Sequence, residues 1–538
     1  MLKKVLLLAL LVLAGAGLSF AQEAESGVPW WNERVFYEIF VRSFYDSNGD
    51  GVGDLRGIIE KLDYLNDGDP TTTDDLGITG IWLMPINPSP SYHGYDVLDY
   101  RAINPDYGTM DDFRELLAEA DARGIAVIMD LVINHTAVDH EWFRASAEDP
   151  DSEFGDWYVW AEEDPGYRGP DRQIVWHPLS GRYYYGVFWS GMPDLNYANP
   201  AVTEEMYDIA AYWLEEVGVD GFRLDAIKHI VEDGRTQENS AQTLAWMAGF
   251  HDLAETVKPD ALLVGEVWSP TASASRYVNE QVDLVFEFDL AEALIRAGGF
   301  GLPNAVRTAV EDVMAAYPAG QYATFLANHD QNRTLSQLNG NVTGAKIAAT
   351  VQLLLPGVPF IYYGEEIGMV GVKPDEDIRT PFQWSAAEDA GFTTGTPWRA
   401  VNADYTTVNV AAQAEDPNSL LNTYRTLIHL RNSTPALQYG DLVWVESTER
   451  KLLTFLRTTD EETVLVVYNM DDRAVTDYTL ALASSGLGEV GEAELLLGAG
   501  EVSASQVSAP TLNGDGGFSD YVPLPELAPE TAYVIRLN

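Results

Sequence analysis

Three carboxylates, Asp225, Glu266 and Asp330, stand at the ends of short apolar segments that are typical of β-strands. The segments read GFRLD, LLVGE and TFLANHD and lie far apart in the chain. A (β/α)8 barrel assembles its active site from the ends of such strands. Carboxylates that meet there in pairs or threes are the groups that cleave glycosidic bonds. The residue types and their positions therefore predict a glycosidase.

The surroundings of two of these carboxylates indicate different roles. Arg223 stands two residues before Asp225, on the same side of the strand. Because a guanidinium lowers the pKa of a neighbouring carboxyl and orients it, we expect Asp225 to be ionised, as a nucleophile must be. Glu266 ends an apolar strand, where burial raises the pKa toward that of a general acid. The alternatives are a structural salt bridge between Arg223 and Asp225 and a structural Glu266.

Two Asn-His pairs also stand at strand ends. They place His135 and His329, which we expect to donate hydrogen bonds to sugar hydroxyls without carrying charge. Tyr95, in the segment YHGYD, offers a face on which the reacting sugar can stack. A histidine pair that binds metal is the alternative, but no H-x-x-x-H spacing occurs in the chain.

Eight apolar runs with helical stretches between them can be identified in the sequence. This alternation predicts a parallel barrel whose strands position these residues. Residues 136–196 separate the third run from the fourth and show no clear helix. Because a structureless loop of that length is uncommon, we expect a small inserted domain there. The predicted strands are residues 35–41, 78–85, 125–132, 218–226, 262–268, 284–290, 323–330 and 360–366.

After a second insertion at residues 369–413 and a helix at residues 417–431, short alternating segments predict an antiparallel sandwich. The predicted fold class is therefore α/β: a (β/α)8 TIM barrel with a small domain inserted after strand 3 and a C-terminal antiparallel β-sandwich. The expected divisions are a signal peptide at residues 1–21, the barrel at 22–133 and 199–436, the inserted domain at 134–198 and the sandwich at 437–538.

The first 21 residues have the pattern of an export signal. Lys3 and Lys4 precede an uncharged apolar run, and Ser19-Phe20-Ala21 offers a cleavage site between small residues. The run is shorter than the roughly 20 residues of a membrane span. We expect a secreted protein, extracellular or periplasmic, that has no membrane contact after signal cleavage. The absence of cysteine excludes disulfides and a thiol nucleophile.

Acidic residues dominate the charge of the chain: 83 Asp and Glu against 32 Lys and Arg give a net charge of −51. Such a field repels nucleic acid and anionic lipid, so neither is an expected partner. A well-solvated acidic surface explains this composition. Adaptation to salt, which screens the self-repulsion, is the alternative.

Four motifs in order resemble those of the alpha-amylase superfamily of glycoside hydrolases: DLVINH, GFRLDAIKH, GEVW and ANHD. A fifth, MPDLN, ends the expected inserted domain. The resemblance implies that Asp225 attacks the anomeric carbon, that Glu266 protonates the leaving oxygen and then activates water, and that Asp330 stabilises the distorted transition state. It implies a retaining mechanism with carboxylates about 5 Å apart. The substrate-binding residues that it implies are Tyr95, His135, Arg223, Lys228, His229 and His329.

A segment that begins at Asp46 places hard oxygen ligands at alternate positions, the pattern that calcium takes. Gly57 stands where an EF-hand needs Glu, so this is a calcium loop without EF-hand helices; a solvated Asp/Gly turn is the alternative. Relatives with this loop bind calcium there, and the resemblance implies a second structural Ca2+ site. The expected ligands are Asp46, Asn48, Asp50, Val52 and Asp54 at the first site, and Asn134, Asp194 and the carbonyl of His229 at the second.

Within the family, Ala226 and Lys228 after the nucleophile resemble enzymes that act on alpha-1,4 glucans. Exo-acting glucosidases commonly carry Asp three residues before the stacking Tyr, where this chain has Tyr92. The segment RTPFQW instead resembles the oligo-1,6-glucosidase branch. We expect a monomeric, secreted, endo-acting alpha-amylase whose partners are starch, maltodextrins and related alpha-glucans. The alternatives are an alpha-glucosidase, an oligo-1,6-glucosidase or a glucanotransferase, and a non-catalytic glucan-binding homologue, against which the three carboxylates argue.

Overall fold

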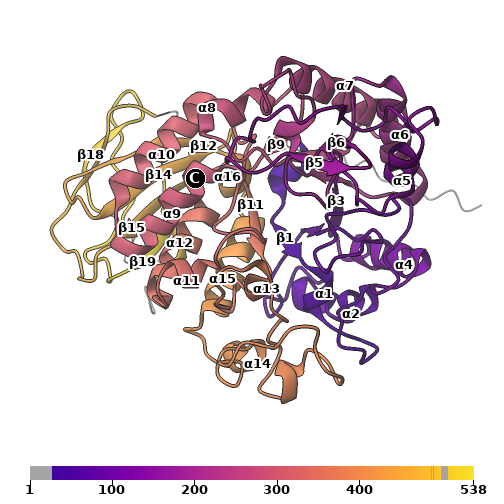
Figure 1. The fold of residues 1–538 in the computed structure, drawn as a ribbon. Helices are drawn as coiled ribbons and strands as arrows, with labels where there is room; N and C mark the ends of the chain where they lie inside the picture. The colour runs from indigo at the N-terminus through magenta and orange to yellow at the C-terminus, as the bar shows by residue number, and fades with distance from the viewer. Residues whose placement is uncertain (1–26, 486, 489, 499–506, 538) are drawn as a thin grey trace, which may run out of the picture.

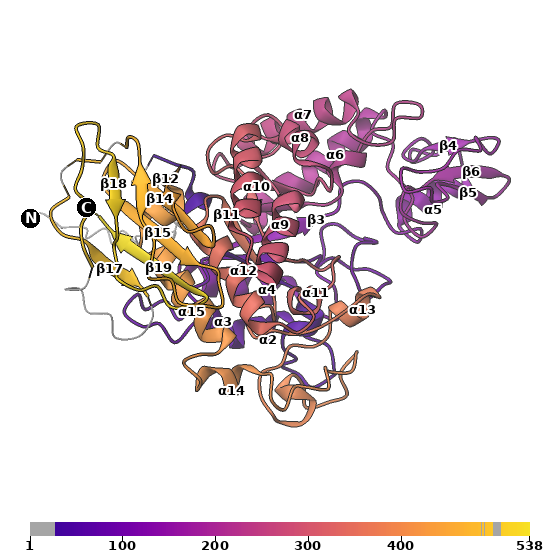
Figure 2. The ribbon, with the colours of Figure 1, turned by 90° about the vertical axis from the view of Figure 1, so that its left-hand side faces the viewer.

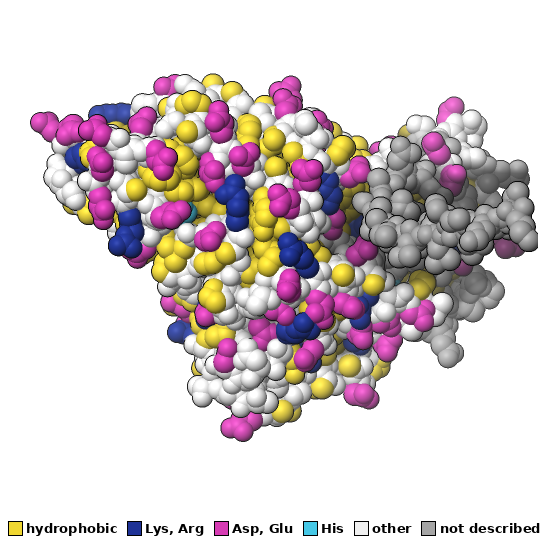
Figure 3. Space-filling view, turned by 90° about the vertical axis from the view of Figure 1, so that its right-hand side faces the viewer, with side chains coloured by type: hydrophobic (Ala, Val, Ile, Leu, Met, Phe, Trp, Pro, Cys, Tyr) yellow, Lys and Arg dark blue, Asp and Glu magenta, His cyan; other side chains and the backbone are white. Residues whose placement is uncertain are grey.

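The computed structural model describes residues 27–485, 487–488, 490–498 and 507–537. The predicted signal peptide at residues 1–21 lies outside the described residues. Within those residues, no helix combines the length and the apolar character that crossing a membrane requires. Asp and Glu side chains are scattered over the face in Figure 3 and are interspersed there with fewer Lys and Arg.

Eight parallel strands form the central sheet, in the order β10–β11–β1–β2–β3–β7–β8–β9. A parallel bridge between Phe286 and Ala323 joins the two outer strands and closes the sheet into a barrel. Figure 1 shows helices packed around it, which confirms the predicted α/β barrel. The strands are β1 (Phe36–Ile39), β2 (Gly80–Leu83), β3 (Ala126–Leu131), β7 (Gly221–Leu224), β8 (Leu262–Gly265), β9 (Leu284–Val285), β10 (Ala323–Thr324) and β11 (Val358–Tyr362).

Side chains from alternate strand positions fill the barrel. Phe36, Trp82 and Ile128 belong to one buried apolar cluster with residues of the other strands. Gly80 pairs with Phe36, and a Cβ at this glycine would lie 2.5 Å from the Phe36 ring. The small residue therefore makes room for a large one in the next strand. This packing holds the strands in register, so their carboxyl ends meet at one edge.

Helix boundaries follow local signals. The helix α4 begins after Thr109, whose side chain and that of Asp112 form a capping box. The helices are η1 (Trp30–Glu33), α1 (Val41–Phe44), α2 (Leu55–Glu60), α3 (Leu62–Leu65), α4 (Met110–Asp121), α5 (Glu141–Glu148), α6 (Pro200–Ala211), η2 (Tyr212–Val217), η3 (Ile227–His229), α7 (Ala241–Val257), α8 (Thr271–Ala274), η4 (Ser275–Tyr277), α9 (Phe288–Phe300), α10 (Pro303–Ala316), α11 (Thr334–Gln337), α12 (Val342–Leu354), α13 (Asp375–Ile378), η5 (Glu388–Gly391), α14 (Val410–Ala414), α15 (Leu420–Asn432) and α16 (Pro435–Tyr439).

The predicted sixth strand, residues 284–290, is too long. Only Leu284–Val285 forms β9, and α9 begins at Phe288. The apolar pattern runs across this boundary because the strand and the first turn of the helix are both buried. Periodicity cannot separate two buried elements over so short a run.

The segment between β3 and β7 projects from the barrel in Figure 2 and contains a small antiparallel sheet. Its strands are β4 (Trp160–Ala161), β5 (Trp176–Leu179) and β6 (Arg182–Tyr185). The prediction that residues 136–196 contain no helix is wrong, because α5 lies there and buries Trp142 and Phe143. At eight residues the helix is too short to show a clear apolar period.

Two antiparallel sheets follow the barrel and enclose a second apolar core. Figures 1 and 2 place them on the side of the barrel that carries α10 and α12. One sheet has the order β12–β14–β15–β19–β17 and the other β13–β16–β18. The strands are β12 (Asp441–Trp444), β13 (Glu446–Ser447), β14 (Leu452–Thr458), β15 (Thr463–Asn469), β16 (Leu480–Leu482), β17 (Glu494–Leu497), β18 (Phe518–Tyr521) and β19 (Thr531–Arg536).

Candidate active site

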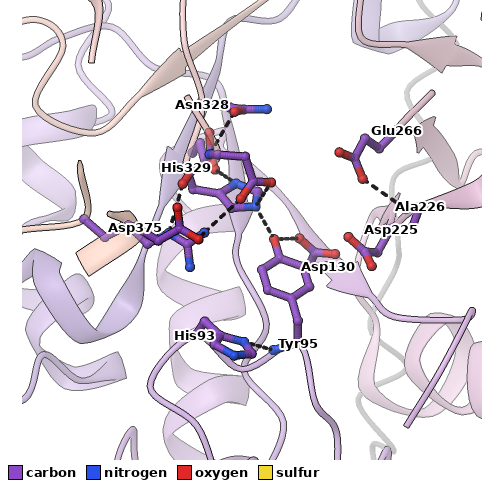
Figure 4. A network of polar contacts seen from close by, with 12 residues as sticks. His93, Tyr95, Asp130, Asp225, Ala226, Glu266, Asn328, His329 and Asp375 are labelled. Atoms are coloured by element: carbon purple, nitrogen blue, oxygen red, sulfur yellow. Dashed lines mark hydrogen bonds and ion pairs between the residues drawn. The ribbon is translucent and has the colours of Figure 1, made fainter. Parts of the chain in front are cut away.

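One guanidinium connects three carboxyl groups at the ends of β3, β7 and β8. Arg223 is fully buried, and the strand register places it directly beside Asp130. Its Nη1 donates to Asp130 Oδ1 at 2.9 Å and to Asp225 Oδ1 at 2.7 Å. Its Nη2 lies 3.0 Å from Glu266 Oε2. The fold therefore brings the predicted nucleophile and the predicted acid together, as Figure 4 shows.

The chain turns sharply after Asp225. Ala226 has a φ of 51°, in the left-handed region that residues other than glycine rarely adopt. In this conformation the backbone N–H of Ala226 donates to Glu266 Oε2 at 3.0 Å. Backbone strain of this kind costs about 1–3 kcal/mol and persists where the surroundings enforce it. The turn fixes Glu266 relative to Asp225.

Burial dominates the electrostatics of this carboxyl group cluster. It raises the pKa of Asp130 to about 7, against the opposing effect of Arg223. Burial also raises the pKa values of Asp225 and Glu266, again against Arg223. The expectation that Arg223 sets a low pKa for Asp225 is therefore wrong. The physical reason is that one guanidinium is shared among three buried carboxyls.

Asp330 follows β10 and contacts two cations instead. His329 Nε2 lies 3.0 Å from its Oδ2, and Arg379 Nη2 donates to its Oδ1 at 2.9 Å. Burial alone would raise the pKa of Asp330, but the His329 imidazolium and the Arg379 guanidinium hold this pKa well below its usual range. Asp330 is therefore a fixed negative charge at neutral pH.

The two strand-end histidines differ in charge. Burial lowers the pKa of His135 to about 4, so this imidazole is neutral, as expected. Burial also lowers the pKa of His329, but Asp330 and Glu38 outweigh it and raise the pKa to about 9. The expectation that both histidines are uncharged is thus wrong for His329, because carboxylate oxygens lie at both of its ring nitrogens.

Tyr95 links the two parts of the site. Its hydroxyl donates to Asp130 Oδ2 at 2.9 Å and lies 2.7 Å from His329 Nε2 (Figure 4). Its ring stacks on the His329 ring with centroids 5.3 Å apart. Because Tyr95 is only 8% exposed, little of its ring is available to a sugar in this conformation.

Lys228 and His229, the other predicted substrate-binding residues, already have partners. Lys228 Nζ lies 2.9 Å from Glu238 Oε2 and donates to the Trp268 carbonyl. His229 Nδ1 lies 2.8 Å from the carbonyl oxygen of Gln237. These contacts fix the segment after the nucleophile.

Exposed aromatic rings adjoin the site. Phe188 is 42% exposed and packs against the rings of His135 and His229. Trp268, two residues after Glu266, is 47% exposed and stacks on Phe288. Rings of this kind, with one face against the protein and the other free, are suited to stacking on sugars.

The Asp46 loop has the ligand set of a calcium site. Asp46 and Asp54 are buried, and backbone N–H groups wrap around the Asp46 carboxylate, including that of Gly49 at 2.7 Å. Asn48 Oδ1 and Asp50 Oδ1 each accept from the backbone two residues on. Carboxylate and amide oxygens are the ligand types that a hard cation takes, and in this structure backbone N–H groups donate to those of Asp46, Asn48 and Asp50. The predicted ligands Asp46, Asn48, Asp50, Val52 and Asp54 are thus close together along one loop.

The second predicted site contains an orphaned pair of carboxyl oxygens. Asp194 Oδ2 and Glu232 Oε1 are buried and have no hydrogen-bond partner. Burial, together with the Glu232 charge, raises the pKa of Asp194, and burial raises that of Glu232 to about 8. Asn134 Nδ2 donates to the His229 carbonyl at 2.8 Å, so a cation here would require the Asn134 amide to turn its oxygen inward. With that rotation, the residues fit a divalent cation.

Sequence reasoning missed four residues of these sites, one of which is Asp130 beside Arg223. Glu38 contacts His329, Arg379 contacts Asp330, and Glu232 lies with Asp194. The position of Glu38 inside an apolar strand is a signal that could have identified it. Burying an unpaired carboxylate there costs free energy, so a cationic partner is expected. Glu232 and Arg379 lie in loops, where the sequence carries no such sign.

Comparisons with known proteins agree with this geometry. The family described as "Alpha amylase, catalytic domain" matches residues 38–440. Alpha-amylase 3 of Dictyoglomus thermophilum is 39% identical over 447 residues, covering 82% of this chain and 86% of the relative. An oligo-1,6-glucosidase of Parageobacillus thermoglucosidasius is 34% identical over 522 residues, covering 82% of this chain and 91% of the relative. The crystal structure of an alpha-amylase from H. orenii is similar with a TM-score of 0.82 at 43% identity, covering 94% of this chain and 99% of that one.

The family match spans most of the chain, and the motif carboxylates meet at the carboxyl ends of the barrel strands. The chain therefore belongs to the alpha-amylase family of glycoside hydrolases.

Proposed function

We propose that this chain is a secreted, endo-acting alpha-amylase that hydrolyses α-1,4-glucosidic bonds in starch and maltodextrins with retention. The observation that supports endo action is the environment of Tyr92. Its ring stacks on Trp398 with centroids 5.3 Å apart and lies 5.9 Å from the Arg379 guanidinium carbon. An aromatic wall at this position, in place of a carboxylate that grips a chain end, favours a site open to further glucose rings.

The proposed reaction has two displacements at the anomeric carbon. Asp225 Oδ forms a bond to this carbon while Glu266 gives its proton to the leaving glycosidic oxygen. The Glu266 carboxylate then takes a proton from water, whose oxygen bonds to the anomeric carbon and releases Asp225. The raised pKa of Glu266 supports its role as the acid. Arg223, which contacts both carboxyls, supports the close spacing that a retaining mechanism needs.

We also propose structural calcium at both sites described above. The ion would be held by oxygen atoms of Asp46, Asn48, Asp50 and Asp54 with the Val52 carbonyl at the first site. Asn134, Asp194, Glu232 and the His229 carbonyl would hold the second ion. When bound, calcium supplies positive charge that offsets the repulsion between buried carboxylates. The Thr393 hydroxyl donates to Asp46 from a segment far away in sequence, so an ion in this loop would also stabilise the contact between the two segments.

The test is the early product distribution from soluble starch and from a chromogenic maltoheptaoside blocked at its non-reducing end, with calcium present. An endo-acting enzyme gives a rapid fall in iodine staining, mixed maltooligosaccharides and cleavage of the blocked substrate. Glucose alone, with the blocked substrate intact, would overturn the proposal.

An alpha-glucosidase or glucanotransferase is the second candidate, and the RTPFQW segment favours it. Its arginine, Arg379, contacts Asp330 inside the site. The 34% identity to an oligo-1,6-glucosidase also supports this candidate. Isomaltose and maltotriose as substrates separate the candidates. An amylase leaves isomaltose intact, an oligo-1,6-glucosidase cleaves it, and a transferase converts maltotriose into longer oligomers.

A further inference from the structure

Glu38 is a buried carboxylate that the proposed displacement steps do not use. It lies on β1 and is 2% exposed. Phe36, two residues earlier and on the same side of the strand, belongs to the apolar filling of the barrel. Glu38 therefore lies at the boundary between the apolar core of the barrel and the polar residues of the site. Burying a carboxylate at such a place is costly unless a cation pairs with it.

The partner of Glu38 is His329. Glu38 Oε1 lies 2.6 Å from His329 Nδ1, and both side chains are buried. The other ring nitrogen, Nε2, lies 3.0 Å from Asp330 Oδ2. A carboxylate only accepts hydrogen bonds, so both ring nitrogens donate and both carry a proton. The geometry is that of an imidazolium held between two carboxylates.

The other groups that face His329 do not replace this arrangement. Tyr95 presents its hydroxyl to Nε2, and Trp82 presents a ring with centroids 5.7 Å apart. Arg379 donates to the backbone carbonyl of His329, not to its ring. Asp130, on β3, is linked to the ring through Tyr95 and Trp82, which both donate to its carboxyl group. Among the described residues, Glu38 and Asp330 are therefore the carboxylates in direct contact with the ring.

We propose that Glu38 is a positioning residue for glycoside hydrolysis: it keeps His329 as an imidazolium whose Nε2–H orients Asp330. This inference rests on the proposed role of Asp330 at the transition state. Without the charge of Glu38, the imidazole loses one proton more readily. A neutral ring that keeps its proton on Nδ1 presents a lone pair to the Asp330 carboxylate. Asp330 then loses one of the two donors that fix its direction.

The first test measures the wild-type protein and uses a variant only for assignment. Nitrogen-15 spectra of histidine-labelled wild-type protein, with the His329 signal assigned through His329→Gln, report the protonation of both ring nitrogens. We expect an imidazolium at pH 7 with a titration midpoint near the pKa of about 9, to which Asp330 and Glu38 raise this imidazole against the opposing effect of burial. A neutral His329 at pH 7 would overturn the proposal.

The second test compares Glu38→Gln with Glu366→Gln. Glu366 is a matched control, since it is also fully buried near a barrel strand end but accepts from the hydroxyls of Tyr37 and Tyr64. We expect Glu38→Gln to lower the His329 pKa by about 1 to 3 units, the range for loss of a neighbouring opposite charge. We expect kcat on maltoheptaose to fall by about 10- to 100-fold, as when a partner that orients a histidine is removed, with a smaller change in KM. Glu366→Gln should leave the His329 titration unchanged.

Glu38→Asp keeps the charge and completes the series. It should restore most of the His329 pKa, which a merely space-filling role of Glu38 would not predict. An unchanged His329 titration in folded Glu38→Gln would contradict the proposal. Because the titration is read without substrate, it remains informative even if the protein proves not to be an endo-acting amylase.

Discussion

The two halves of the active site differ in the ratio of cations to carboxylates. Around Arg223, one guanidinium is in contact with Asp130, Asp225 and Glu266, and burial raises the pKa of each. Around Asp330, an imidazolium and a guanidinium both contact this carboxylate, and its pKa lies well below the usual range. His329 also contacts Glu38 and Arg379 also contacts Asp375, so two cations are shared among three carboxylates there. The first half is suited to moving protons and the second to holding a fixed charge. All four carboxylates lie within the same barrel edge, so the ratio of charges and not burial alone decides their behaviour.

The largest effect is expected for a substitution in the half of the site around Arg223, which is suited to moving protons. Glu266→Gln should lower kcat on starch by about 100- to 10,000-fold, the usual contribution of a general acid and base. A maltosyl fluoride substrate needs no acid in the first step, so its burst of fluoride release should persist. Stopped-flow fluoride detection measures this. Equal losses on both substrates would contradict the assignment of Glu266 as the acid.

Arg223→Lys weakens the contacts of the cation in the same half of the site and leaves all three carboxyl groups in place. Lysine has one ammonium and cannot span three carboxyls, so we expect a loss of about 100-fold in kcat, as for a misplaced catalytic group. Since Arg223 lowers the pKa of Asp225, its replacement should raise this pKa further. Activity needs ionised Asp225, so the acid limb of the pH–rate profile should move to higher pH. A limb that stays in place would show that Arg223 has no electrostatic role.

Arg379→Gln tests the fixed-charge half. Removal of a charged hydrogen bond to Asp330 should lower kcat by about 10- to 100-fold. Because His329 still contacts Asp330, this carboxylate stays ionised near neutral pH. The acid limb of the pH–rate profile should therefore not move. A shift like that of Arg223→Lys would remove the distinction between the two halves.

The pair Asp194 and Glu232 extends the comparison to buried carboxyl groups that have no Arg, Lys or His partner among the described residues. With the pKa of Glu232 raised to about 8 from an ordinary value of about 4.3, the folded state binds more protons across this window, and stability falls as pH rises through it. Glu232→Gln should therefore stabilise the calcium-free protein at pH 8 by about 1–3 kcal/mol. With calcium present, the same change should destabilise, because a ligand is lost. Thermal unfolding with EDTA and with calcium measures both signs, and the same sign in both would argue against a cation there.

Most of the fold follows from the sequence because each barrel strand is a short apolar run flanked by helical stretches. Among the predicted strands that are too long, β9 is followed at once by a buried helix. After β10, the buried residues Phe325, Leu326 and Ala327 continue the apolar run beyond the strand. The helix α5 was missed because eight residues are too few for a period to appear. The first error concerns the end of an element and the second a whole short element, and in both the local pattern is too short to decide.

For the active site, too, some features follow from the sequence and others only from the tertiary structure. The sequence by itself determined the identity of Asp225, Glu266 and Asp330, since strand-end carboxylates in family motifs need no distance to be recognised. Only the tertiary structure decided that Glu38 pairs with His329, that Arg379 pairs with Asp330, and that Asp225 has a raised pKa. Protonation depends on which charges and how much solvent surround a group in space. Those neighbours come from segments as far apart as residues 38 and 379, and only the closed barrel brings them together.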